Sequence, residues 1–268
     1  MGSSDWKIGT SAGLCGELIG DTLRACAEAG LAWVEALLWG EWLQVGGDPA
    51  ARCVALRREG EKRGVRFWSA HLPFGNAWDV SVPDVTERRR IVAALGELLP
   101  LAADLGARKA VIHGSYEPLA SGEREARIEA CRDSLSRLSD RAARAGLQLA
   151  LECLPRTCLG NTSGEVRLLI EGLPALGVCC DTNHLLQERA EGFIAALGSR
   201  IVTLHVSDYD GVDERHWLPG RGVNNWKAIV AALEGAGYDG PVMFEVDRRG
   251  PGGPVTPADL RACWDGMR

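Results

Sequence analysis

The sequence predicts a single (β/α)8 barrel, of the kind called a TIM barrel, over residues 1–268, and three observations predict it. Short apolar segments alternate with longer amphipathic segments, and this alternation repeats eight times along the chain. Several of the short segments are apolar throughout, as expected of parallel strands that are buried on both faces. The chain length of 268 residues suits one such barrel, which typically needs ~250 residues.

The short segments are rich in β-branched or aromatic residues, and each predicts a strand. The strands are expected at residues 6–11, 32–39, 65–71, 109–115, 147–153, 177–181, 200–208 and 241–247. The intervening segments have apolar residues at helical spacing; in the first of them, Leu18, Ile19, Leu23 and Cys26 share one face. The helices are expected at residues 17–30, 48–64, 82–106, 121–146, 163–173, 191–198, 225–237 and 256–267.

Local signals mark the ends of several helices. Thr162 and Glu165 have the spacing of a capping box, and Thr256 followed by Pro257 is a typical helix start. Glycines stand where five helices should stop, at Gly30, Gly64, Gly106, Gly146 and Gly237. A doubly wound parallel sheet is the alternative fold. It usually has a glycine-rich phosphate loop after an early strand, and GTSAGLCG at 9–16 lacks that spacing.

Composition argues against two classes of partner. Hydrophobic residues make up 46% and charged residues 25% of the chain, which is typical of a soluble globular domain. The 36 acidic residues outnumber the 30 basic ones and give a net charge of −6. Proteins that bind nucleic acid or anionic membranes usually show the opposite balance, and no apolar run approaches the ~20 residues that span a bilayer. We therefore expect neither nucleic acid nor membrane as a partner.

The cysteines indicate a reducing compartment. Their number, nine, is odd, and no pair has CxxC spacing. The first thirteen residues also lack the basic start and apolar stretch of a secretory signal. We expect reduced thiols in a cytoplasmic protein.

Chemically active side chains gather at one end of the predicted barrel, where barrel enzymes have their active sites. All five histidines fall there: His71, His113, His184, His205 and His216. Glu35, Glu152, Asp181 and Glu245 stand at the ends of strands on the same side. Burying unpaired carboxylates costs several kcal/mol, and a divalent cation compensates for converging carboxylates. Imidazole together with carboxylate favours zinc, manganese, iron or cobalt over calcium.

Six stretches carry a resemblance to a known family. They are SAHLPFG, VIHGS, LECLPRTCLGNTSGE, CCDTNHLL, HVSDYDGVDERHWLPGRG and VMFEVD. In this order, along nearly the whole chain, they resemble the xylose-isomerase-like barrel superfamily. Its nearest groups are the sugar phosphate isomerases and epimerases and the endonuclease-IV-type AP endonucleases. The motifs are weak one by one and specific as a set.

The resemblance to the epimerases implies one divalent metal ion and a set of site residues. The metal ligands of that group fall on Glu152, Asp181, His205 and Glu245, and its substrate-binding histidine falls on His184. A substrate-binding arginine is placed on Arg215, although the loop is longer here. Some epimerases have a second glutamate where this chain has Cys158, so their substrate details do not transfer.

The resemblance to the endonucleases implies three metal ions instead. Their ligands fall on His71, His113, His184 and His216 in addition to the four above, and Glu214 takes the place of an aspartate. Basic clusters occur at 57–58, 88–90 and 248–249. The first two lie in predicted helices and are expected to face solvent. Only Arg248 and Arg249, after the last strand, are placed to meet an anionic ligand.

The function expected from these residues is that of a metal-dependent isomerase or epimerase of a sugar or keto-polyol. One ion (Mn, Zn, Co, Fe or Mg) would stabilise an enediolate, and Glu152 and Glu245 would remove and return a carbon-bound proton. More than one ion is left open. Substrate contacts are expected from His71, His113, His184, Arg215, His216 and Trp39.

Trp39, Trp42 and Trp78 lie in predicted loops at the barrel mouth, where they could pack on a sugar or simply on one another. The expected substrate is a small sugar or polyol, with or without a phosphate group. Three alternatives stay open: an endonuclease-type phosphodiester hydrolase, a keto-polyol dehydratase, and a non-catalytic binding barrel. Homo-oligomerisation is also left open.

Overall fold

The computed structural model of the protein describes residues 6–15, 19–39 and 41–267. Eight parallel strands stand side by side in the order β7-β6-β5-β4-β3-β2-β1-β8. They are β1 (Ile8–Ser11), β2 (Trp33–Leu37), β3 (Arg66–His71), β4 (Lys109–His113), β5 (Gln148–Glu152), β6 (Gly177–Asp181), β7 (Ile201–His205) and β8 (Val242–Phe244).

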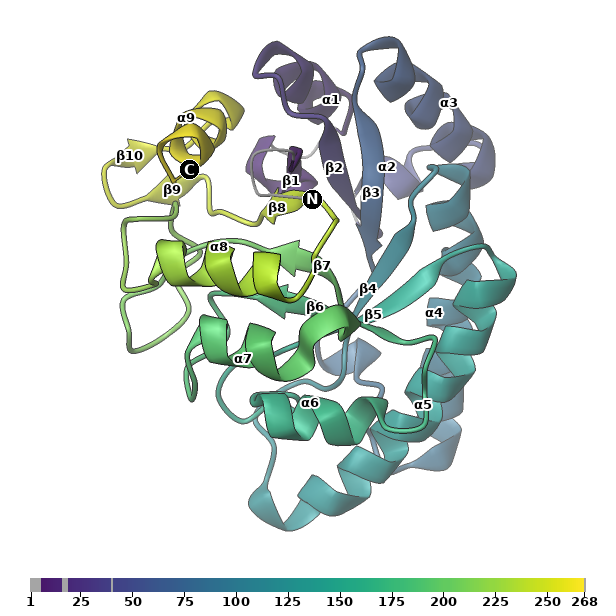
Figure 1. The fold of residues 1–268 in the computed structure, drawn as a ribbon. Coiled ribbons are helices and arrows are strands. Elements are labelled where there is room, and N and C mark those ends of the chain that lie inside the picture. The colour runs from purple at the N-terminus through teal and green to yellow at the C-terminus, as the bar shows by residue number, and fades with distance from the viewer. Residues whose placement is uncertain (1–5, 16–18, 40, 268) are drawn as a thin grey trace.

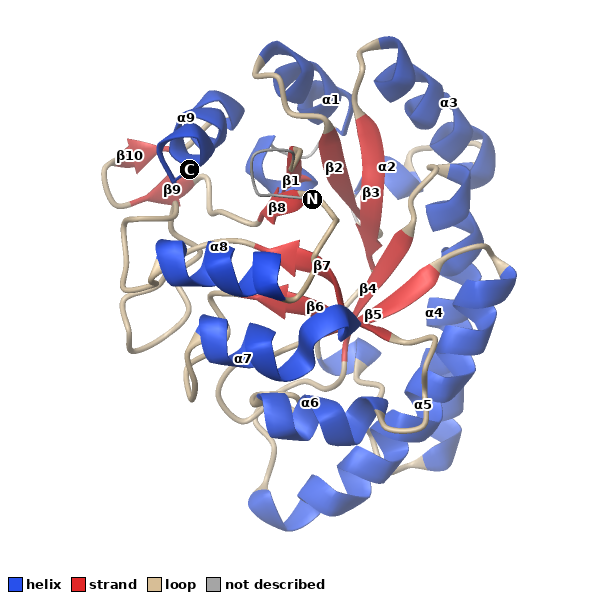
Figure 2. Ribbon diagram, viewed as in Figure 1, coloured by secondary structure: helices blue, strands red, loops and turns tan. Residues whose placement is uncertain are grey.

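The two outer strands of this order meet just beyond the end of β7, which closes the sheet. The amide of Val206 donates to the carbonyl of Met243 at 2.8 Å, and the amide of Glu245 donates to the carbonyl of Val206 at 3.2 Å. The predicted (β/α)8 barrel is therefore confirmed, and Figure 2 shows its strands enclosed by helices.

The helices form the outer layer (Figure 1). They are α1 (Ile19–Glu28), α3 (Pro49–Lys62), α4 (Val85–Asp104), α5 (Arg124–Arg144), α6 (Ser163–Ile170), α7 (Ala190–Leu197), α8 (Trp226–Gly235) and α9 (Pro257–Met267). Each lies within one of the predicted helical segments or overlaps it to within a residue. Leu18, predicted to share one face of the first helix with Ile19, lies outside the described residues.

Helix ends follow the predicted signals. The Thr162 hydroxyl accepts a hydrogen bond from the Glu165 amide at 3.3 Å and caps α6. Asp48 and Asp84 cap α3 and α4 in the same way. The five glycines expected after helices all have φ between 71° and 80°, a left-handed conformation that glycine adopts without steric cost.

Short elements were not predicted, because they are too brief to show a period. These are α2 (Glu41–Gln44), the 3-10 turns η2 (Ala12–Cys15), η3 (Asn76–Trp78), η4 (Ser121–Glu123) and η5 (Gly198–Arg200), and the hairpin of β9 (Arg249–Gly250) and β10 (Gly253–Pro254). Gly252, with φ of 104°, lies in the hairpin turn, and Gly253, with φ of 112°, begins β10.

Apolar side chains fill both sides of the strands. A large core lies between the strands and the helices, and a smaller cluster of Val111, Ala150 and Cys179 lies inside the barrel. None of the eight cysteines whose side chains are described forms a disulfide bond with another described residue. Over the described ranges, no helix is both long and apolar enough to cross a bilayer.

Strand register brings the predicted site residues together. His113 on β4 is the register partner of Glu152 on β5, and Asp181 on β6 is the partner of His205 on β7. All four are the last residues of their strands. The barrel therefore gathers them at its C-terminal end.

Candidate metal centre and active site

Glu152 is the centre of the site, because four histidines surround its carboxylate. One oxygen, Oε2, lies 3.0 Å from Nε2 of His71 and 3.2 Å from Nε2 of His113. The other, Oε1, lies 3.1 Å from Nδ1 of His205 and 3.4 Å from Nδ1 of His184. Burial acts to raise the pKa of Glu152, but His205 and His113 outweigh it and hold that pKa well below its usual value. The carboxylate is therefore ionised at neutral pH.

Four residues from four strand ends could share one ion. Glu152, Asp181, His205 and Glu245 offer ligand atoms that all lie within 4.8 Å of one another. Nδ1 of His205 is 3.0 Å from Oε2 of Glu245 and 3.9 Å from Oδ2 of Asp181. Ligands at ~2.0–2.2 Å from a common centre, as for zinc, fit within this spacing. These are the four residues that the sequence suggested as metal ligands.

The surroundings of the Asp181 carboxylate show whether the site suits a cation. Its Oδ1 accepts a hydrogen bond from the Asn183 amide at 2.6 Å. Its Oδ2 is buried and has no hydrogen-bond partner among the described residues. Burial raises the pKa of the Asp181 carboxyl to about 6. A buried carboxylate oxygen without a partner costs stability unless a cation balances it, so the donor set suits a divalent metal ion.

Glu35, the third residue of β2, contacts His205 on the side of its ring that faces away from the other carboxylates. Its Oε2 lies 3.1 Å from Nε2 of His205 and accepts a hydrogen bond from the Ser69 hydroxyl at 2.6 Å. Nε2 of His205 therefore donates to Glu35, and Nδ1 of the same ring faces the carboxylates of Glu152 and Glu245. Metal-binding histidines usually have such a partner on the second ring nitrogen. The sequence showed Glu35 near a strand end but gave no sign of its partner.

A second group of possible ligands lies higher in the mouth. Nε2 of His184 is 3.2 Å from Oε2 of Glu214, and His216 completes the group. The Asn183 side chain holds this loop, because its Oδ1 accepts the backbone amide of His216 at 3.0 Å. A third group consists of His71, His113 and Glu152. The barrel mouth thus brings together all the residues suggested as additional ligands.

Arg156 is a charged site residue that sequence reasoning missed. Its guanidinium binds Asp213 at 2.6 Å and Glu214 at 2.8 Å, and it also binds Glu117. These carboxylates, Glu117 first among them, raise the pKa of Arg156 well above its usual value. Its φ of 49° is uncommon for a residue other than glycine, and such conformations often occur at functional sites. Arg156 thus ties together the loops after β4, β5 and β7.

The structure does not bring Arg215 to the cavity. Its Nε lies 2.7 Å from Oδ2 of Asp210, and its side chain is 43% exposed. Arg248 and Arg249 are also exposed, at the start of the β9–β10 hairpin. None of the three belongs to the described cavity lining. Asp210 also accepts the backbone amides of Val212 and Asp213 at 2.8 and 2.9 Å, so its carboxylate holds Arg215 within the loop after β7.

A cavity of about 320 Å³ opens above these groups. His71, His113, His184 and His216 line it together with Glu152 and Glu245. Phe74 and Tyr116, with 45% and 41% of their surface exposed, form an aromatic wall that the sequence did not predict.

The tryptophans predicted at the mouth contribute less directly. Trp39 does not line the cavity, but its ring packs edge-on against His71 and Phe74, with centroid distances of 5.4 and 5.3 Å. Trp42 is buried and donates to the Leu37 carbonyl, and Trp78 packs against the core. Simple packing therefore accounts for Trp42 and Trp78.

The fold and the site can be compared with known proteins. The family model described as "Xylose isomerase-like TIM barrel" matches residues 23–264. A ketose 3-epimerase of Arthrobacter globiformis is 30% identical over 183 residues, which are 66% of this chain and 62% of the epimerase. The chain thus spans less than two thirds of that relative's length.

Solved structures share the fold along almost the whole chain. A D-tagatose 3-epimerase-like protein matches with a TM-score of 0.81 at 22% identity, covering 96% of this chain and 94% of its own. The 3-keto-D-glucoside 4-epimerase of E. coli matches with a TM-score of 0.79 at 19% identity, covering 98% and 99%.

Proposed function

The chain belongs to the xylose isomerase-like TIM barrel family, and we propose that it is a metal-dependent ketose epimerase. One relationship carries the proposal. Glu152 and Glu245 approach the same atom, Nδ1 of His205, at 3.1 and 3.0 Å from different strands at the cavity floor. Two carboxylates so placed can act on opposite faces of one substrate carbon. The similarity to a ketose 3-epimerase supports this reaction.

Glu152, Asp181, His205 and Glu245 would hold the divalent ion. When bound, such an ion supplies positive charge beside the substrate oxygens and stabilises charge that develops on them. The candidate ions are Mn, Zn, Co, Fe and Mg. His205 is oriented for this role, since Glu35 holds its other ring nitrogen.

The two glutamates would move the proton. One carboxylate takes the proton from the carbon next to the ketone, which leaves an enediolate. The other glutamate, which enters this step in its protonated form, then gives its proton to the opposite face of the same carbon, so the configuration inverts. Proton exchange with water afterwards returns the first glutamate to its carboxylate form and the second to its acid form. Positioned groups of this kind contribute ~10²–10⁴-fold to rate. The low pKa of Glu152 keeps its carboxylate ionised, which is the form that a general base requires.

The cavity walls favour an uncharged sugar. Four histidines line the cavity and can bind hydroxyl groups, while Phe74 and Tyr116 offer apolar faces for the sugar carbons. Arg156 is the single arginine among the described lining residues, and three carboxylates already surround it. A substrate phosphate would have to compete with them. We therefore propose an unphosphorylated ketose.

The two further ligand groups favour a second candidate, a phosphodiester hydrolase with more than one metal ion. His71 and His113 beside Glu152, and Glu214 beside His184 and His216, could each hold another ion. Metal content distinguishes the candidates: one ion per chain supports the epimerase, and two or three support the hydrolase.

The test is a deuterium-exchange screen. The protein is stripped with a chelator, reloaded with each candidate metal in turn, and incubated in D₂O with D-fructose, D-tagatose, D-psicose and L-ribulose. NMR should show deuterium at the carbon next to the ketone, together with the epimeric sugar. Loss of water from a keto-polyol would instead identify a dehydratase. Cleavage of abasic-site DNA without exchange into any ketose would overturn the proposal.

A further inference from the structure

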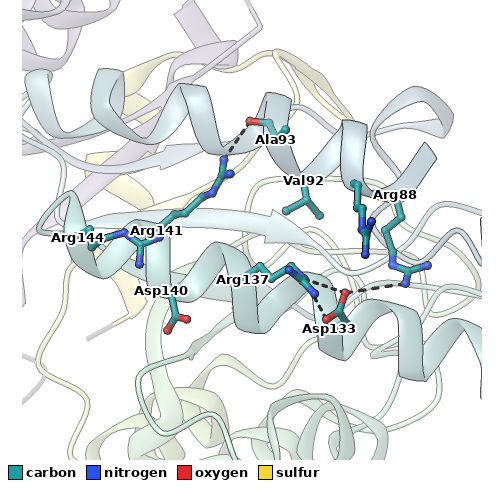
Figure 3. Close-up of a pocket in the computed structure, with 9 residues that line it drawn as sticks. Arg88, Val92, Ala93, Asp133, Arg137, Asp140, Arg141 and Arg144 are labelled. Atoms are coloured by element: carbon teal, nitrogen blue, oxygen red, sulfur yellow. Dashed lines mark hydrogen bonds and ion pairs between the residues drawn. The ribbon is translucent and has the colours of Figure 1, made fainter. Parts of the chain in front are cut away.

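A basic groove runs between α4 and α5 on the outer layer of the barrel (Figure 3). Its volume is about 400 Å³. Five arginines line it, and we call it the α4/α5 groove: Arg88 and Arg89 come from α4, and Arg137, Arg141 and Arg144 come from α5. Such a concentration of positive charge is unexpected in a chain whose net charge is −6, and the proposed epimerase reaction does not use it.

The acidic side chains of the groove leave most of this charge uncompensated. Asp133 pairs with Arg137 at 3.0 Å and lies 3.9 Å from Arg88. The carboxylate of Asp140 points away from the arginines in Figure 3. Five arginines and two aspartates give the lining a net charge of +3. Neither Arg89 nor Arg144 forms an ion pair with another described residue.

Gly96, in the middle of α4, shapes the floor beneath Arg141. A Cβ at this position would lie 2.0 Å from Nη1 of Arg141. The guanidinium lies next to the α4 backbone, where its Nη1 donates to the carbonyl of Ala93 at 3.4 Å. A glycine inside a helix costs roughly 0.5–1 kcal/mol relative to alanine. Here the space above the glycine is occupied by the end of the Arg141 side chain.

A second hollow adjoins the α4/α5 groove beyond Arg141, along α4 and α5. This hollow, of about 540 Å³, is lined by Gly96 and Pro100 of α4 and shares Arg141 and Arg144 with the α4/α5 groove. Arg88, at the other end, is fixed in place because its Nη1 donates to the carbonyls of Val82 and Pro83 at 2.8 and 3.1 Å. The arginines are thus spread along the helices.

The geometry points to an anion-binding site for a small molecule that carries two or more phosphate groups. Guanidinium groups bind phosphate oxygens in a planar, paired fashion, and arginines spread along a groove match several phosphates better than one. The volume lies within the range of ~300–1,000 Å³ that is typical of small-molecule sites.

The test is a titration of the full-length protein by calorimetry in zwitterionic buffer. The probes are tripolyphosphate, fructose 1,6-bisphosphate and orthophosphate. Both multiply charged probes should bind at least about tenfold more tightly than orthophosphate, and their affinity should fall as salt is added. If only tripolyphosphate exceeds orthophosphate, the ligand is an inorganic polyphosphate and not a phosphate ester. Equal affinity for all three probes would overturn the proposal.

Matched variants place the binding in the groove. Arg144→Gln and Arg141→Gln should each weaken tripolyphosphate binding on the order of fivefold, as expected when one exposed ion pair is lost. Arg58→Gln is the control, since Arg58 is an exposed arginine of α3 without an ion pair in the described chain. It should change the affinity less than twofold. Thermal unfolding confirms that each variant folds, and ketose exchange should stay unchanged in all three.

Two outcomes would contradict the site. One is an equal effect of Arg58→Gln and Arg144→Gln, which would mean that the anion follows overall charge. The other is tighter binding of duplex DNA than of tripolyphosphate, with loss in Arg144→Gln, which would make the groove a nucleic-acid surface.

Discussion

Glu35 and His205 are in direct contact beneath the cavity, with Oε2 of Glu35 lying 3.1 Å from Nε2 of His205. The two residues come from β2 and β7, which are not neighbours in the sheet. Both are buried. The contact fixes which nitrogen of His205 faces the proposed metal ligands, because Nε2 donates to Glu35 and Nδ1 is left for an ion.

The first prediction is that Glu35 controls metal affinity without binding the ion. Glu35→Gln keeps an acceptor for His205, so it should weaken metal binding only slightly. Glu35→Leu removes the acceptor and should weaken it ~10–100-fold, as is typical for such supporting partners. A competing chelator measures the affinity, and thermal unfolding checks the fold. Equal metal affinity of the Leu variant and the unchanged protein would contradict this role.

The second prediction concerns pH. In the protein without metal, both ring nitrogens of His205 face carboxylates, at 3.1 Å from Glu35 and 3.0 Å from Glu245. Burial acts to lower the pKa of His205, but Cys179 and the carboxylates of Glu245, Glu35 and Glu152 raise it well above its usual value. The ring is therefore protonated at pH 7, and an ion must displace the Nδ1 proton.

Metal affinity should accordingly fall as the pH falls, by about tenfold per unit for one displaced proton. The dependence should vanish only above the raised pKa of His205. Calorimetric titrations in buffers of different ionisation heat should show release of at least one proton per ion. A metal affinity that is independent of pH between 6 and 8 would mean that His205 is neutral before the ion binds.

The third prediction separates Arg156 from Arg215. Arg156→Ala leaves Glu117, Asp213 and Glu214 without their shared cation, and Glu214 contacts His184. We expect KM for the ketose to rise on the order of tenfold, a loss of ~1.4 kcal/mol, with a smaller change in kcat. Arg156→Lys should recover only part of this, because an ammonium group cannot bridge three carboxylates in one plane.

Arg215→Ala is the matched control for Arg156. Its side chain is 43% exposed and pairs with Asp210 outside the cavity, so KM should change less than about twofold, as expected for an exposed ion pair. A large rise in KM for Arg215→Ala with none for Arg156→Ala would show that the loop after β7 closes differently around the sugar.

How far the sequence predicts this site depends on whether a residue lies in a periodic segment. His113, Glu152 and Asp181 end strands that are recognisable from their apolar runs, and parallel strands must end on the same side. The fold and this ring of side chains could therefore be predicted. Arg156 lies in a loop, where no periodic pattern places its side chain. Its three partners lie 39 to 58 residues away from it along the chain.

The contact between Glu35 and His205 lies beyond such reasoning for another reason. Both strands were predicted, but their meeting depends on the curvature of the closed barrel, which no local pattern encodes. Trp42 and Trp78 are a case in which the sequence suggested a site residue and the structure shows a packing residue instead. Trp42 and Trp78 sit in segments that look like open loops, yet α2 and η3 form there, and Trp42 and Trp78 pack against the core.

The last prediction concerns the two glutamates at the cavity floor. Glu152→Gln and Glu245→Gln each remove a negative ligand and, on the proposed mechanism, a proton-transfer group. Activity should fall ~10²–10⁴-fold, far more than folding stability falls. Excess metal separates the two roles. A ligand role alone predicts that activity recovers with metal occupancy, whereas a proton-transfer role predicts full occupancy with exchange still lost. His184→Ala should raise KM while leaving metal content nearly unchanged. If both Gln variants exchange the substrate C–H with deuterium at the normal rate once the metal site is full, these two glutamates do not carry the proton.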